Sequence, residues 1–79
     1  MATAYVLINA KVGHEYDIRA ELESVEGVED VTLVYGVYDV IARIRQHNLE
    51  EIKSLILSKI RKSPYVKSTI TLVAIEDLE

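Results

Sequence analysis

Cysteine, tryptophan and phenylalanine are all missing from this 79-residue chain, which also has only three glycines and one proline. Without cysteine, the protein cannot form disulfides, thiolate metal sites or a thiol nucleophile. Three glycines are too few for a loop that cradles phosphates. No stretch approaches the roughly 20 apolar residues that a membrane-spanning helix needs. Several common classes of site are therefore excluded by composition.

Basic residues are in the minority, with nine Lys and Arg against thirteen Asp and Glu, a formal net charge of −4 and a pI near 5.1. Proteins bind nucleic acid largely through clustered cations that release counterions from phosphates, so we expect no direct nucleic-acid partner. The first residues lack the basic and long apolar segments of a signal peptide. We therefore expect a cytoplasmic protein with no membrane partner.

The length predicts one domain over residues 1–79, and a small one. A chain of this size buries only about 60% of the surface that its unfolded form exposes, so folding alone is marginal. The apolar share of 49% is too high for a disordered chain. Since disulfides are excluded, oligomerisation is the remaining way to add buried surface.

Hydrophobic periodicity predicts the element order strand, helix, strand, strand, helix, strand. The expected elements are a strand at 4–12, a helix at 15–25, hairpin strands at 29–35 and 37–45, a helix from 49 to about 62 and a strand at 65–75. Asn48 followed by Glu51 forms a capping box that starts the second helix. This order is that of an α+β ferredoxin-like βαββαβ domain, an antiparallel sheet with both helices on one face.

The opposite face of the sheet would then be open. Alternation in strands three and four assigns two sets of side chains to this face: Asp39, Ile41, Arg43 and Arg45, and Thr69, Thr71, Val73 and Ile75. These sets contain too many apolar groups for a face in water, so we expect a dimer through it. The alternative is that they are ordinary scattered surface residues.

Residues 31–44 contain two β-branched and aromatic runs joined at Gly36, with Asp39 just past the joint. This pattern predicts a β-hairpin whose tight turn carries an acid. An aspartate in that position either accepts hydrogen bonds from nearby backbone N–H groups or binds a ligand, and the pattern leaves both open.

Catalytic motifs are scarce. His14 and His47 lack metal-ligand spacing, and no serine lies in a nucleophile elbow. We therefore expect no catalytic residue, no metal site, no cofactor and no enzymatic activity.

The chain resembles the RAM domain (regulation of amino-acid metabolism), the effector domain of the leucine-responsive and asparagine-responsive regulators (Lrp/AsnC). The matching motifs are the Gly13 turn and residues 25–28, 34–39 and 65–71. The hairpin and strand-four motifs together are fairly specific, and the resemblance covers nearly the whole chain. The family's usual helix-turn-helix is missing, so the resemblance is to a stand-alone RAM domain.

The resemblance implies an effector sensor that binds a small molecule, typically a free amino acid, between dimers near the hairpin turn. The matching ligand-binding positions are Tyr35, Gly36, Tyr38 and Asp39 in the hairpin and Thr69 and Thr71 in strand four. Asp39 would pair with the α-ammonium group, and backbone N–H groups around Gly36 would accept from the carboxylate. The resemblance also implies homodimers that close into rings of four or five.

Two alternatives from other classes stay open. One is a structural module that co-assembles with full-length Lrp/AsnC regulators and binds no ligand. The other is an enzyme on the related dimeric α+β barrel scaffold, for which this chain offers no Trp, no Phe and no acid–base pair.

Overall fold

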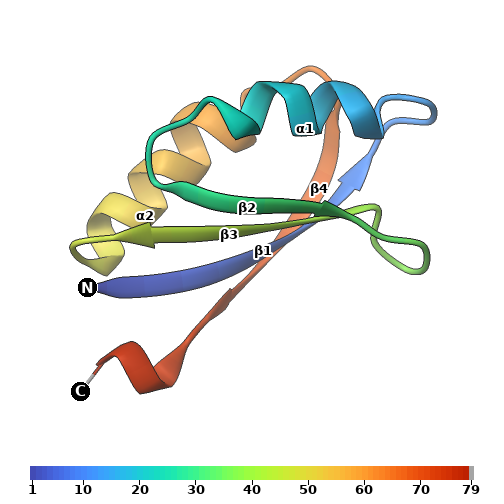
Figure 1. Cartoon of the computed structure of the whole chain (residues 1–79). Coiled ribbons are helices and arrows are strands. Elements are labelled where there is room, and N and C mark those ends of the chain that lie inside the picture. Colours follow the sequence, from blue (N-terminus) through green and yellow to red (C-terminus); the bar gives the residue numbers. More distant parts are fainter. Residues whose placement is uncertain (79) are drawn as a thin grey trace.

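A four-stranded antiparallel sheet with two helices on one face makes up the computed structural model, which describes residues 1–78 (Figure 1). The strands lie in the order β2-β3-β1-β4 and comprise β1 (Ala2–Ala10), β2 (Val28–Leu33), β3 (Val40–Gln46) and β4 (Val66–Val73). The helical elements are α1 (Glu15–Glu23), α2 (Leu49–Leu55), a π-helical turn η1 (Ile56–Ile60) and a 3-10 turn η2 (Ile75–Leu78). This arrangement confirms the ferredoxin-like βαββαβ fold.

Both helices bury the apolar stripe that their periodicity predicts. In α1 the buried residues are Ile18 and Leu22, one turn apart. The side chain of Asn48 accepts a hydrogen bond of 2.9 Å from the backbone N–H of Glu51, which confirms the predicted cap of α2. Residues 56–60 form a wider π-helical turn instead of continuing α2, so the predicted single helix to residue 62 is only partly correct.

The core lies between the helices and the two central strands. Its strand residues, all from one face of β1 and β3, are Ala2, Ala4, Val6, Ile8, Val40, Ala42 and Ile44. Its helical residues are Ile18, Leu22, Ile52, Leu55, Ile56 and Ile60. The helix-facing residues of β1 and β3 are fully or almost fully buried, so the helices cover the sheet well at these two strands.

Strand β4 presents the opposite faces from those predicted by simple alternation. Asn9 pairs with Ser68 but Ala10 pairs with Val66, so Lys67 is an extra residue in a β-bulge. Beyond a bulge every side chain changes face, because the period of a strand is two residues.

The prediction that Thr69, Thr71 and Val73 lie on the open face is therefore wrong. These residues pair with Ile8, Val6 and Ala4, which face the helices, whereas Ile75 lies beyond the end of the strand. The assignment of Ile41, Arg43 and Arg45 to the open face is confirmed, because they lie opposite Leu7, Tyr5 and Thr3 in β1.

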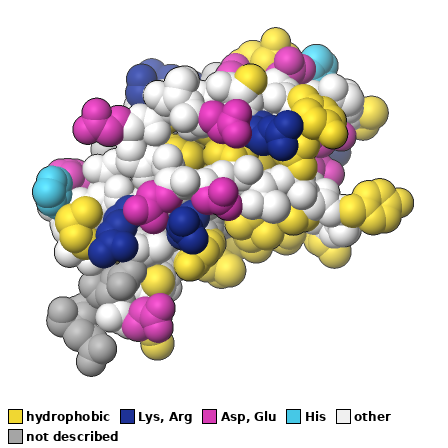
Figure 2. Space-filling model, in the orientation of Figure 1, with side chains coloured by type: hydrophobic (Ala, Val, Ile, Leu, Met, Phe, Trp, Pro, Cys, Tyr) yellow, Lys and Arg dark blue, Asp and Glu magenta, His cyan; other side chains and the backbone are white. Residues whose placement is uncertain are grey.

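The bulge places Ile70 opposite Leu7 and Leu72 opposite Tyr5 on the open face. Together with Ile41 these residues form what we call the open-face patch: Tyr5, Leu7, Ile41, Ile70 and Leu72. Ile70 and Leu72 are 47% and 52% exposed. Hydrophobic side chains gather on the side of the sheet away from the helices (Figure 2). At the edge of this face the Arg43 guanidinium lies 3.2 Å from the Glu29 carboxylate.

Among the described residues, no helix has the length and apolar character needed to cross a membrane.

Candidate functional site

The connection between β2 and β3 is a six-residue loop (residues 34–39), so the prediction of a tight hairpin turn is wrong. The Val34 N–H donates to the Asp39 carbonyl at 2.9 Å, which closes the base of the loop. The loop widens because the Asp39 N–H donates to the Ile8 carbonyl of β1 instead of to β2, at 3.0 Å. Gly36 has a φ of +159°, close to extended backbone.

The Asp39 carboxylate is the polar anchor of this loop. Its Oδ2 atom accepts a hydrogen bond of 2.7 Å from the backbone N–H of Ala10, at the end of β1. Asp39 is half-buried. The structure therefore contains the backbone interaction that was one of the two readings of this aspartate. Because a carboxylate offers about four acceptor positions, this bond leaves capacity for a ligand.

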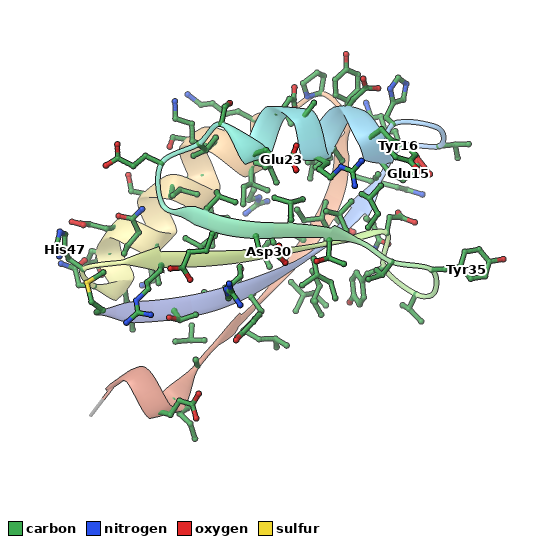
Figure 3. The ribbon with its side chains drawn as sticks, viewed as in Figure 1. Glu15, Tyr16, Glu23, Asp30, Tyr35 and His47 are labelled. Atoms are coloured by element: carbon green, nitrogen blue, oxygen red, sulfur yellow. The ribbon has the colours of Figure 1, made fainter. Side chains whose placement is uncertain are left out.

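The other predicted residues of the loop surround Asp39 at different depths. Tyr35 is fully exposed and projects beyond the end of the sheet (Figure 3). Gly36 is exposed, whereas Tyr38, the residue before Asp39, is half-buried. The loop of one chain is therefore an open surface of backbone and aromatic side chains. It would not enclose a ligand without a surface from another molecule.

Thr69 and Thr71 lie elsewhere, in a hollow of about 470 Å³ between β4 on one side and α2 and η1 on the other. We call this hollow the β4–α2 groove; its lining residues are Leu49, Ile52, Lys53, Ile56, Leu57, Arg61, Thr69, Thr71 and Val73. None of these residues belongs to the 34–39 loop. The structure thus divides the six predicted ligand-binding residues between two places.

Sequence reasoning missed the groove itself and its two cations, Lys53 and Arg61. The signal was present in residues 69–73, where threonines alternate with isoleucine and leucine. Simple alternation assigned the threonines to the wrong face, because the bulge at Lys67 reverses which of the two sets faces the helices.

A further hollow of about 540 Å³ lies where the connection from α1 to β2 meets α2. Its lining is mostly polar and contains no predicted site residue: Ser24, Val25, Glu26, Gln46, Glu51, Ser54, Leu55, Ser58 and Lys59. In the part of the chain that the structure describes, no three His, Asp or Glu side chains come together as metal ligands.

Sequence comparison finds a matching family model and matching relatives. Residues 3–79 match the family model described as the Lrp/AsnC ligand binding domain. The HTH-type transcriptional regulator FL11 of Pyrococcus abyssi is 32% identical over 73 residues, covering 92% of this chain and 48% of the relative. The chain spans about half the length of the curated relatives that it matches.

Structural comparison finds the same fold in solved proteins. A hypothetical protein from Pyrococcus horikoshii superposes with a TM-score of 0.90 at 32% identity, over 94% of this chain and 89% of that one. A transcriptional regulator from Neisseria meningitidis, solved in complex with L-Met, shares the fold with a TM-score of 0.87 at 10% identity, over 99% of this chain and 52% of that one. From the family model, which matches nearly its whole length, the chain belongs to the Lrp/AsnC ligand binding domain family.

Proposed function

We propose that this protein is an effector-binding module that holds a free amino acid at the 34–39 loop. The observation that carries the proposal is the position of Asp39, half-buried and anchored through one carboxylate oxygen below an exposed loop. The family is a regulatory ligand-binding domain, and the Neisseria meningitidis protein of the same fold was solved with an amino acid.

The ligand's α-ammonium group would pair with the Asp39 carboxylate, and its carboxylate would accept from backbone N–H groups near Gly36. Charge-assisted hydrogen bonds of this kind are short and strong where water is excluded. One subunit leaves Tyr35 fully exposed, so the site would be completed by a neighbouring subunit. Thr69 and Thr71 line a different surface, and the proposed contact set is therefore limited to Tyr35, Gly36, Tyr38 and Asp39.

The same proposal includes a homodimer through the open-face patch. Two of its five apolar side chains are about half exposed in the single chain, and a contiguous apolar patch typically marks an interaction surface. Pairing two such faces forms a closed, two-fold assembly, the commonest kind of homo-oligomer. Rings of four or five dimers would then bring one dimer's 34–39 loop against the next.

Isothermal titration calorimetry with the twenty amino acids tests the ligand. Asp39→Ala would leave the ammonium group unpaired, at a cost of about 2–5 kcal/mol, which abolishes measurable binding of a micromolar ligand. Asp30→Ala is the matched control, because it removes an exposed carboxylate that only accepts from the Thr32 hydroxyl. The proposal fails if no amino acid binds, or if Asp39→Ala binds as tightly per folded molecule as the parent protein.

A purely structural module is the second candidate, and one observation favours it: the bond to Ala10 accounts for Asp39 without any ligand. Such a module would co-assemble with full-length Lrp/AsnC regulators through the open-face patch. Co-purification with a full-length regulator in amino-acid-free buffer, together with a blank calorimetric screen, would support it over the sensor.

A further inference from the structure

The β4–α2 groove is a strip of the sheet that the helices leave uncovered. α2 packs over β3 and β1. The helix-facing residues Thr69, Thr71 and Val73 of β4 line the groove and remain accessible at the sheet edge. Leu57 on the helical side is 57% exposed and Val73 on the strand side is 37% exposed. An apolar hollow of this size, about 470 Å³, is large enough for several side chains of a partner.

Two cations define what could fill the groove. Lys53 and Arg61 both line it. Residues 49–62 carry four basic side chains against two acidic ones, in a chain whose net charge is −4. The Lys53 ammonium is 3.8 Å from Glu50 at a highly exposed position, where such a pair contributes little. The groove is therefore suited to an occupant that is both apolar and acidic.

The C-terminal segment has that chemistry: residues 74–79 have the sequence AIEDLE, with no basic residue. Ile75 is 80% exposed. The Ala74 N–H donates to the Thr3 carbonyl at 2.9 Å, which holds the start of the segment against β1. From there the η2 backbone lies away from the helices and outside the groove of its own chain (Figure 1).

We propose that residues 75–79 of one copy dock in the β4–α2 groove of a second copy, and that the exchange is reciprocal. Val73 lines the groove and the segment begins at the next residue, so a two-fold axis near this corner places each segment beside the other chain's groove. The six residues 74–79 reach roughly 20 Å when extended. Ile75 would enter the apolar floor, and the acidic side chains would face Lys53 and Arg61. The proposal requires that two copies associate but not that an amino acid binds.

Disulfide trapping tests the exchange, because the chain has no cysteine of its own. Leu57→Cys and Ile75→Cys proteins are unfolded, mixed, refolded and oxidised, and the bridge is identified by peptide mass mapping. Docking predicts a bridge between positions 57 and 75 of different chains. Ser58→Cys mixed with Ile75→Cys is the control, because Ser58 is adjacent in η1 but lines the polar hollow instead. The 57–75 bridge should form at least about tenfold faster, as expected for a high effective concentration.

Charge reversal supplies a second, independent measurement. Lys53→Glu with Arg61→Glu on the Leu57→Cys chain should slow trapping, and Glu76→Lys with Asp77→Lys on the Ile75→Cys chain should restore it. Equal rates for positions 57 and 58 would overturn the proposal. So would a bridge confined to one chain when Leu57→Cys and Ile75→Cys are combined. If light scattering still reports a dimer in those cases, the open-face dimer stands and only the segment exchange fails.

Discussion

The carboxylate of Asp39 and the backbone N–H of Ala10 meet at 2.7 Å, which ties the loop after β2 to the last residue of β1. Ala10 is also the residue at which the pairing of β1 with β4 shifts by one position. The proposed ligand loop, the end of β1 and the bulge in β4 are therefore one connected unit. A ligand held by Asp39 would contact a side chain that is bonded to the end of the central strand β1.

Replacing Asp39 separates its structural role from its charge. Asp39→Ala leaves the Ala10 N–H without its acceptor and should lower the free energy of unfolding by about 1 kcal/mol. Asp39→Asn keeps an oxygen that can accept this bond, so it should lose less. Urea denaturation measures both values, and equal stability of the two variants would show that the Ala10 bond contributes nothing.

Ile41 lies in the middle of the open-face patch, opposite Leu7. Ile41→Glu would bury an unpaired charge in the proposed dimer and should shift the protein toward monomer or unfolded chain. Light scattering at micromolar concentration checks the mass against the 8.9 kDa of one chain. Val12→Glu is the matched control, because Val12 is fully exposed in the loop before α1. A monodisperse monomer in the parent protein would contradict the dimer.

Gly27 is the most constrained glycine of the chain. It has a φ of +99°, and a Cβ there would overlap the amide of Gln46 and lie 2.9 Å from Leu55 Cδ1. Gly27→Ala should therefore cost about 2 kcal/mol or more of stability. Gly13→Ala is the comparison, because its φ is +83° but a Cβ would meet nothing within 4 Å.

Gln46→Ala in the Gly27→Ala background should recover the part of the loss that comes from the amide overlap. Denaturation of the four proteins in this double-mutant cycle separates crowding from backbone strain. If Gly13→Ala costs as much as Gly27→Ala, then crowding by Gln46 and Leu55 has no measurable effect.

The cap at Asn48 should be worth about 1 kcal/mol. Asn48→Ala removes the acceptor for the Glu51 N–H, whereas Asn48→Ser or Asn48→Asp retains one. Thermal unfolding of the three variants should therefore rank Ala below both Ser and Asp. No difference among the three would mean that water replaces the cap without cost.

The sequence was sufficient to predict the element order, both helix stripes and the cap, because each depends on local spacing. It also predicted the open-face role of Ile41, Arg43 and Arg45, since β3 alternates without interruption. It failed at β4 and at the 34–39 loop, where the outcome depends on long-range bonds. The Asp39 N–H pairs with Ile8, and Lys67 is left out of the β1–β4 ladder. Neither the Asp39–Ile8 bond nor the omission of Lys67 can be recognised from the residues of its own segment.

The bulge at Lys67 reverses the alternation of β4 between Val66 and the residues from Ser68 onward. A chain lacking Lys67 would exchange the sides of the rest of β4, placing Ile70 and Leu72 beneath the helices and the threonines on the outer surface. The open-face patch would lose Ile70 and Leu72 and gain Val73, and apolar side chains would replace the threonines in the groove. One inserted residue thus determines which surface of the domain is apolar, and so which other molecules can bind to it.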